Sequence, residues 1–448
     1  MQILDFANYD NNSIKERFGA PEYSYLFVRN AFRPVLSKFG PHIEIENPNA
    51  QADVFYEEAR QRGDDCILLT FCPPNTTPLG QICPTLPVFA WEYDTLPYEA
   101  WTDDPRENWL YVLERTGMAI THCSFSTRAV RDAMGENFPV WTIPAPVFDR
   151  FARPDLKPVG WRSASSLAVG GGLVLSAGEI DLSLFAPHRA KTDGLRALRM
   201  LNAERASGLR GSQTVELEGV IYAAVFNPHD GRKNWEALVS GFVWAFRDTA
   251  TATLVLKLTR FDLEAGILPV LQHLSTLGEF ACKIWIIDGL LSDEAYAALI
   301  EATTFAVNTA YGEGQCLPLM EYMSAGKPAV AAAHSAMLDY LSPENTFVVK
   351  HEARPTNWPH DERLAMRCYH SSVSFVDLVA QYRESYRVAR NEPGRYQRMS
   401  EAAVESLRAF CSEAVATERF AEVVRHVHGA SRSRAADSAR ANAASSVG

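Results

Sequence analysis

The chain has 448 residues, 47% of them hydrophobic and 22% charged, which suits two domains of ordinary size, each with its own core. Its formal net charge of -11 argues against a nucleic-acid partner, because binding a phosphate backbone needs a basic face. The amino terminus lacks a basic region before an apolar core, and no run reaches about 18 apolar residues, so we expect a cytoplasmic protein without a membrane span.

The eight cysteines are scattered along the chain and never form a Cys-x-x-Cys pair. Several of them fall inside apolar, strand-like runs such as residues 66–72. This distribution predicts buried thiols in a reducing compartment.

Residues 1–150 alternate short apolar strands with helical stretches, which is the pattern of a doubly wound α/β sheet. The predicted strands cover residues 2–9, 66–71, 87–91, 118–124 and 140–146. The predicted helices cover residues 24–40, 107–117 and 126–135. We therefore expect a Rossmann-like first domain over 1–150.

Residues 151–215 lack this pattern and are interpreted as an insertion or an extended linker. Within it, 166–185 could form a surface hairpin whose tip carries three glycines at 170–172, and 191–208 is weakly helical. The triple glycine is not a dinucleotide-binding turn, because no later glycine opens a helix at the required spacing.

Residues 216–370 regain the strand–helix alternation and predict a second Rossmann-like domain. After the strand at 220–226, an apolar helix face begins at Trp235 and places Arg232 and Lys233 at the helix start. Cations there oppose the helix dipole unless an anion lies between, so a bound phosphate would explain them. The alternative is a basic pair solvated in a loop. Lys257, near the end of the strand at 254–259, is a further candidate phosphate contact.

Residues 308–328 predict a strand end, a tight turn at Gly312 and Gly314, and a short helix that stops at Gly326. The helix dipole favours an anion at the first N–H groups, which belong to Gln315, Cys316 and Leu317. Glu321 lies about one helical turn further on and could accept hydrogen bonds from a ribose diol, while Glu313 in the turn faces the group beyond the phosphates. The alternative is a corner with two solvated acids. A Walker phosphate loop is excluded, because Pro328 follows Gly326-Lys327.

The same stretch carries a resemblance to a known family. Two glutamates separated by seven residues, with Gly314, Leu317 and Pro318 between them and Ala325-Gly326-x-Pro328 after them, resemble the donor-binding motif of retaining glycosyltransferases of family 4. The resemblance implies the GT-B architecture, in which two Rossmann-like domains face each other across a cleft. It also implies transfer of a sugar from a nucleotide-diphosphate sugar to an acceptor hydroxyl with retention, without a metal or another cofactor.

The resemblance assigns roles to the motif residues. Glu313 would contact the donor sugar and Glu321 the ribose, while Lys233 matches a lysine that neutralises the diphosphate. Arg232 would replace the family's arginine, because Asn227-Pro228 stands where Gly-Arg is expected. Gln315-Cys316 likewise replaces the usual Phe-Gly. The turn at Asp288-Gly289 corresponds to the one that lines the nucleobase through its main chain.

The first domain matches the family only through its strand–helix rhythm. Where family members carry an acceptor-side polar residue, often histidine, this chain has Glu92 and Asp94. Either acid could contact an acceptor hydroxyl, or both could simply be solvated loop residues. His122 could be an active residue or a satisfied residue of the cleft wall. The loop at 18–21 lies where the family places a glycine-rich phosphate contact.

Residues 371–428 predict helices interrupted at Pro393-Gly394, and in GT-B enzymes the last helix crosses back to the first domain. Residues 429–448 are rich in Ala, Ser and Arg and predict a disordered tail with, at most, peripheral contact to an anionic membrane. The expected partners are a nucleotide-sugar donor and a glycan, lipid-linked or small-molecule acceptor. A nucleotide-sugar 2-epimerase of the same architecture, or a non-catalytic sugar-nucleotide-binding module, are the alternatives.

Overall fold

The computed structural model describes residues 1–9, 24–155, 158–169, 173–207, 213–259, 262–359, 361 and 363–445. The chain forms two compact units. Among the described residues, unit 1 holds 1–9, 24–146 and 410–445, and unit 2 holds 147–409. The predicted loop at 18–21 and the glycines at 170–172 lie outside the described residues.

Unit 1 contains a six-stranded sheet in the order β2-β1-β3-β4-β5-β6, with every neighbouring pair parallel. All five predicted strands form, and only the short β2 was not predicted. Parallel strands need crossover connections, and helices supply most of them here. The strands are β1 (Gln2–Ala7), β2 (His42–Glu44), β3 (Cys66–Phe71), β4 (Thr85–Phe89), β5 (Ala119–Thr121) and β6 (Val140–Thr142).

The helices of unit 1 include one that was not predicted, α3. The side chain of Asn47 accepts a hydrogen bond from the N–H of Ala50, and Pro48 occupies the first turn, which are both standard features of a helix start. The helices of unit 1 are α2 (Ser24–Leu36), α3 (Pro48–Gln61), α4 (Trp109–Thr116), α5 (Ser124–Met134) and α14 (Glu413–Ser445). Short 3-10 turns are η1 (Pro74–Thr76) and η2 (Pro105–Glu107).

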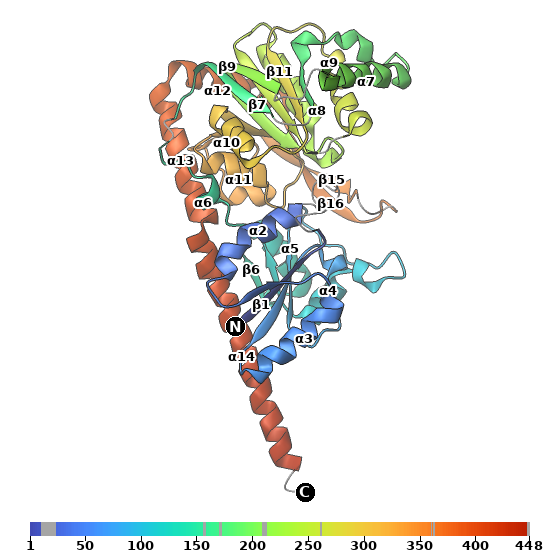
Figure 1. Cartoon of the computed structure of the whole chain (residues 1–448), viewed down its shortest axis with the longest axis vertical. Coiled ribbons are helices and arrows are strands. Elements are labelled where there is room, and N and C mark those ends of the chain that lie inside the picture. Colours follow the sequence, from blue (N-terminus) through green and yellow to red (C-terminus); the bar gives the residue numbers. More distant parts are fainter. Residues whose placement is uncertain are drawn as a thin grey trace. The chain divides into compact units, whose positions relative to one another are not determined.

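Helix α14 packs against α2 and β6 within unit 1 (Figure 1). The ring of Phe420 lies 5.1 Å from that of Phe39, and Arg419 donates to the carbonyl oxygen of Thr142 at 3.0 Å. The helix continues to Ser445, within the stretch that was predicted as a tail. The tail is rich in alanine, the strongest helix former, and this propensity extends the helix. Among the described helices, none combines the length and the hydropathy that crossing a membrane requires.

Unit 2 contains an eight-stranded sheet, in which seven strands follow the order β14-β13-β12-β9-β10-β11-β8 and β7 pairs with β9 off this path. All neighbouring pairs along the path are parallel except β8 with β11. Figure 1 shows α8 and α9 on one face of this sheet and α10 and α11 on the other. The strands are β8 (Leu173–Ser176), β9 (Gln213–Phe226), β10 (Ala252–Leu258), β11 (Lys283–Asp288), β12 (Phe305–Asn308), β13 (Ala329–Ala331) and β14 (Thr346–Val348).

The segment predicted as an insertion, 151–215, is largely integrated into this sheet. β7 (Arg162–Val169) pairs antiparallel with the first half of β9, and β8 pairs antiparallel with β11 at the sheet edge. β7 and β8 therefore pair with other strands instead of with each other, so the predicted hairpin was wrong. The adjacent helix α7 (Lys191–Ser207) confirms the predicted helical stretch.

The helices of unit 2 follow the predicted pattern, with a boundary between α12 and α13 at Pro393. The principal ones are α6 (Phe148–Phe151), α8 (Trp235–Phe246), α9 (Leu268–Ser275), α10 (Asp293–Ala302), α11 (Leu317–Ser324), α12 (Phe375–Asn391) and α13 (Pro393–Cys411). Short turns are η3 (Ala177–Glu179), η4 (Leu182–Phe185), η5 (Gly231–Lys233), η6 (Leu263–Ile267) and η7 (Ser335–Asp339). A separate antiparallel pair, β15 (His351–Asn357) with β16 (Arg367–Val373), was not predicted.

Aromatic side chains fill the main core of unit 2. Tyr222 of β9 is fully buried, and its ring lies 5.4–5.5 Å from the rings of Phe242, Phe305 and Tyr382. This packing joins α8 and α12 to the centre of the sheet. All eight cysteines of the chain are free and buried, which confirms the prediction of buried thiols.

Candidate functional site

The candidate site lies where the strand order of unit 2 reverses. From β9 the chain proceeds to β10 and β11 on one side of the sheet, and then returns to β12 on the other side of β9. The carboxyl ends of β9 and β12 are therefore neighbours that lead into diverging connections. In open α/β sheets, ligands bind at such a switch point. Both sequence clusters predicted to bind the donor follow these two strands.

The loop after β9 presents two cations in a fixed conformation. Asp230 caps the turn η5 by accepting from the N–H of Arg232 at 3.2 Å, and its other oxygen accepts from Arg232 Nη2 at 2.9 Å. Asn234 then takes a left-handed conformation, with φ 47°, and α8 begins at Trp235. Arg232 and Lys233 thus stand just before the helix start, as the helix pattern predicted.

The structure brings Arg232 and Lys233 together with Glu313. Lys233 Nζ lies 2.8 Å from Glu313 Oε1 and 3.0 Å from Oε2, and Arg232 Nη1 lies 3.6 Å from Oε2. Arg232 also donates to the carbonyl oxygen of Gly312 at 3.0 Å, and its own carbonyl accepts from the N–H of Tyr311 at 2.8 Å. Residues 80 positions apart therefore form one ion-paired cluster.

Burial makes this cluster electrostatically strong. The Glu313 side chain is 4% exposed, and the Arg232 and Lys233 side chains are each 19% exposed. Burial alone would raise the pKa of Glu313, but Lys233 and Arg232 outweigh it and hold the pKa below its usual value. Burial likewise opposes the charge of Lys233, but the Glu313 carboxylate outweighs it and raises the pKa of Lys233. Both groups are therefore charged at neutral pH.

The turn before α11 gets its shape from Cys316. This residue adopts φ 62°, whereas neither Gly312 nor Gly314 has a positive φ; the chain bends at Gly314, as predicted, and Cys316 takes the left-handed conformation. Cys316 occupies the N-cap position without a side-chain cap, and Pro318 lies in the first turn of α11, as predicted. Glycine adopts the left-handed region without strain, and Cys316 stands where the family pattern has glycine.

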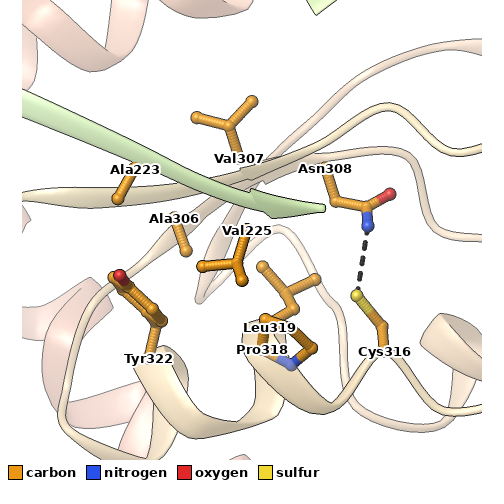
Figure 2. A pocket seen from close by; sticks show the side chains of 9 residues that line it. All are labelled: Ala223, Val225, Ala306, Val307, Asn308, Cys316, Pro318, Leu319 and Tyr322. Carbon is orange, nitrogen blue, oxygen red and sulfur yellow. Dashed lines mark hydrogen bonds between the residues drawn. The ribbon is translucent and has the colours of Figure 1, made fainter. Parts of the chain in front are cut away.

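Asn308, at the end of β12, joins the parts of this turn. Its Nδ2 donates to Glu313 Oε1 at 3.0 Å and to Cys316 Sγ at 3.1 Å. Figure 2 shows the second of these bonds at the edge of a small pocket between β9, β12 and α11, which Cys316 and Tyr322 also line. Asn308 is therefore a polar link between the strand end and the turn.

Glu321 lies on α11 in a different environment. Tyr296 of α10 donates its hydroxyl hydrogen to Glu321 Oε2 at 2.6 Å. Burial raises the pKa of Glu321 to about 7, although the Tyr296 hydrogen bond and the charge of Arg150 oppose the rise. At neutral pH this carboxyl group therefore titrates, in contrast to Glu313.

Lys257 and Asp288 lie at the ends of β10 and β11. Lys257 donates to the carbonyl oxygen of Leu258 at 2.6 Å and is 3% exposed, and burial lowers its pKa to about 8. Asp288 is fully buried, and burial raises its pKa to about 7, although Lys257 opposes this rise.

The candidate acceptor residues belong to unit 1. Glu92 is half-buried and Asp94 is exposed in the loop after β4, where the Thr95 hydroxyl donates to Asp94 at 3.4 Å. His122 is fully buried and its Nδ1 lies 2.9 Å from the carbonyl oxygen of Ile143. Burial lowers the pKa of His122 to about 4, so its ring is neutral.

Sequence reasoning missed several residues of the site. Asp230, Asn308 and Tyr296 each hold a predicted residue in place. Ser335 contacts the backbone of Glu313, and His334 contacts Ser335. A signal was present for two of them: Asp230 precedes Arg232 at capping distance, and Asn308 ends a buried strand at the switch point. No comparable local pattern marks the other three.

No protein-family model matches the sequence, and no curated protein matches it. Among solved structures, sucrose-phosphate synthase from Thermosynechococcus elongatus aligns with a TM-score of 0.52 and 14% identity, covering 96% of this chain and 100% of that one. HepE from Anabaena, solved in complex with UDP, aligns with a TM-score of 0.49 and 12% identity, covering 95% and 100%. A glycosyltransferase from Rickettsia africae ESF-5 gives a TM-score of 0.49 and 11% identity, covering 95% and 98%. At such identities the similarity establishes the fold alone, and that fold is the GT-B fold of glycosyltransferases, as predicted from the sequence.

Proposed function

We propose that this chain is a retaining glycosyltransferase of the family 4 type, which moves a sugar from a nucleotide-diphosphate sugar to an acceptor hydroxyl. The observation that carries the proposal is the buried ion pair between Lys233 and Glu313 at the switch point. It unites a cation suited to phosphate with a carboxylate suited to sugar hydroxyls. The GT-B fold, shared with sucrose-phosphate synthase, supports the proposal.

Donor binding would reorganise this pair. The cluster of Arg232, Lys233, Glu313 and Asp230 carries two formal positive and two formal negative charges, so it is balanced as it stands. A diphosphate next to Lys233 would compete with Glu313 for the ammonium group. Glu313 would then accept hydrogen bonds from the sugar, which places the sugar beside the turn and the phosphates beside the two cations.

The start of α11 would hold the other side of the diphosphate. The N–H groups at Gln315, Cys316 and Leu317 lie at the positive end of the helix dipole. Glu321, one turn further along, would accept from the ribose diol in place of the Tyr296 hydroxyl. A donor in this position would lie along the turn and the first turn of the helix.

The reaction mainly requires stabilisation of the negative charge that develops on the departing diphosphate. The bond between the anomeric carbon and the diphosphate oxygen breaks, and its electron pair stays on the diphosphate. The acceptor oxygen bonds to the anomeric carbon on the same face, and its proton goes to the departing phosphate oxygen. Preorganised cations at the leaving group stabilise the charge that develops there, which is usually the largest catalytic contribution. No protein nucleophile is assigned.

A thermal-shift screen of nucleoside diphosphates and their sugars tests the proposal. A ligand at 100 times its dissociation constant adds about 2.7 kcal/mol to the free energy of unfolding, so the correct donor should raise the melting temperature clearly. Each hit is then incubated with candidate glycan, lipid-linked and small-molecule acceptors, with Glu313→Gln as the control whose turnover should be strongly reduced but still measurable. A glycosylated acceptor supports the proposal. An epimerised sugar, or binding without any turnover, would instead support one of the two alternatives.

A further inference from the structure

His334 and Ser335 form a buried pair next to the turn that carries Glu313. They follow β13, the strand beside β12, and are 4% and 6% exposed. Ser335 has φ 46°, in the left-handed region that costs a non-glycine residue about 1 kcal/mol or more. Such strain persists only where the surroundings require it, and here the Ser335 hydroxyl has specific partners.

Two hydrogen bonds fix the backbone of Glu313 against this pair. The N–H of Glu313 donates to Ser335 Oγ at 3.0 Å. The carbonyl oxygen of Glu313 accepts from the N–H of Ala336 at 3.1 Å. Both polar groups of the Glu313 backbone are therefore held by adjacent residues of one loop, which defines the direction in which the Glu313 side chain leaves the turn.

His334 completes the arrangement. Its Nδ1 lies 3.0 Å from Ser335 Oγ, which already accepts from Glu313, so we assign the Ser335 hydroxyl hydrogen to the bond with Nδ1. This assignment leaves the proton of the neutral ring on Nε2, and the ring also has a hydrogen bond with the backbone of Ala310, which opposes the effect of burial on the pKa of His334. Burial lowers the pKa of His334 to about 4, so the ring is neutral at pH 7 and can accept at Nδ1.

We propose that Ser335 and His334 are positioning residues that orient the Glu313 carboxylate toward the donor sugar. The inference rests on the proposed function. His334 Nδ1 orients the Ser335 hydroxyl, Ser335 Oγ accepts from the Glu313 N–H, and the carboxylate is thereby held within reach of Lys233. Neither residue needs to touch the substrate. A misplacement of the carboxylate by about 1 Å could cost about 100-fold in rate.

Two substitutions of His334 separate positioning from substrate contact. Asparagine can present an acceptor near the place of Nδ1, whereas glutamine reaches the place of Nε2. We expect His334→Gln and Ser335→Gly to lower kcat by about 10- to 100-fold while the affinity for the nucleoside diphosphate stays within about twofold, and His334→Asn to restore most of kcat. Rescue by glutamine instead of asparagine would overturn the proposal, because it would assign a substrate contact to Nε2.

A second measurement covers variants that fold poorly. In a Glu313→Gln background, His334→Gln should cause almost no further loss of kcat, because its effect passes through the carboxylate. Independent, additive losses would contradict the inference. His273→Asn is the matched control, since His273 Nε2 pairs with Ser240 Oγ at 2.8 Å outside the site. Failure of the proposed function would appear in the unmodified protein as absent donor binding and turnover, whereas failure of this inference appears only in the variants.

Discussion

Two glutamates of unit 2, eight residues apart, have carboxyl groups whose pKa values shift in opposite directions. Glu313 lies against Lys233 and Arg232, and these cations hold its pKa below the usual value despite burial. Glu321 has the neutral hydroxyl of Tyr296 as its close partner, and burial raises its pKa to about 7. Burial acts in the same direction on both carboxyl groups, so the neighbouring cations decide the outcome.

This difference separates two kinds of acceptor. Glu313 is a permanent anion at neutral pH, and its charge is balanced by groups that could also bind phosphate. Glu321 gains or loses its proton near neutrality, so its strength as an acceptor varies with pH. If the donor binds as proposed, Glu313, which stays ionised, accepts hydrogen bonds from the sugar. Glu321, whose ionisation varies with pH, accepts them from the ribose.

Removing Lys233, the cation paired with Glu313, should have the largest effect on the rate of sugar transfer. Lys233→Met should lower the transfer rate by about two to three orders of magnitude, because it removes a preorganised contact to the leaving group. It should also lower the free energy of unfolding by about 3 kcal/mol, because Glu313 is left as a buried, poorly paired charge. Transfer assays and urea unfolding measure the two effects separately.

The double variant Lys233→Met/Glu313→Gln should recover stability without recovering transfer, since it removes both charges of the pair. Lys283→Met is the matched control, because Lys283 forms an ion pair with Glu218 at the far end of β11. A folded Lys233→Met protein with an unchanged transfer rate would remove Lys233 from the site and direct attention to Lys257.

The affinity for a nucleoside diphosphate without a sugar should distinguish the roles of Glu321 and Glu313. Glu321→Ala should weaken it by about 10- to 150-fold, because a charged hydrogen bond to the ribose is worth about 1.5–3 kcal/mol. Glu313→Ala should leave it nearly intact, since a nucleoside diphosphate has no sugar beside the turn. Calorimetry gives both dissociation constants. Equal losses in the two variants would show that the roles of turn and helix are wrongly divided.

The pH dependence of nucleotide binding should sharpen the contrast. Glu321 is protonated below its pKa of about 7 and ionised above it, so nucleotide affinity should rise between pH 6 and pH 8. The gain should be about fivefold, the difference between a neutral and a charge-assisted hydrogen bond. Glu321→Gln should remove that part of the pH profile and leave only the titration of the diphosphate itself. An identical profile in both proteins would contradict the assignment of Glu321.

Removal of divalent metal should have the smallest effect. Because Arg232, Lys233 and the start of α11 are proposed to balance the diphosphate charge, a chelator should change donor binding and transfer by less than about twofold. The measurement compares the same protein with and without EDTA, and then with added Mg²⁺. If EDTA abolished sugar transfer and Mg²⁺ restored it, a metal would contribute, with Arg232 and Lys233, to balancing the diphosphate charge.

Much of the fold was predictable because its strands are long apolar runs. β3 and β10 are buried on both faces, and their sequences reveal them directly. The helix α3 was missed although Asn47-Pro48 gave a start signal, because its surface carries few apolar residues. β7 and β8 were predicted to pair with each other because their true partners, β9 and β11, lie far along the chain. The pair β15–β16 was missed.

The site was predictable where a short motif carries the chemistry. The spacing of Glu313 and Glu321 and the basic pair before α8 are local patterns, and the structure brings Lys233 and Glu313 together. The supporting contacts are not local: Ser335 reaches Glu313 across 22 residues, and Tyr296 reaches Glu321 across 25. The left-handed conformation of Cys316 was also hidden, because sequence patterns assign such positions to glycine.

Helix α14 gives the chain an unusual order of assembly. Among the described residues, unit 1 contains the first strand and the last helix of this chain, whereas unit 2 is one continuous segment between them. On a ribosome, residues 147–409 are complete before the helix that covers Phe39 and Thr142 has been synthesised. Within this chain, the unit that begins first is therefore finished last, so loss of the residues from Glu413 onward would remove packing from the unit that contains β1 and leave unit 2 whole.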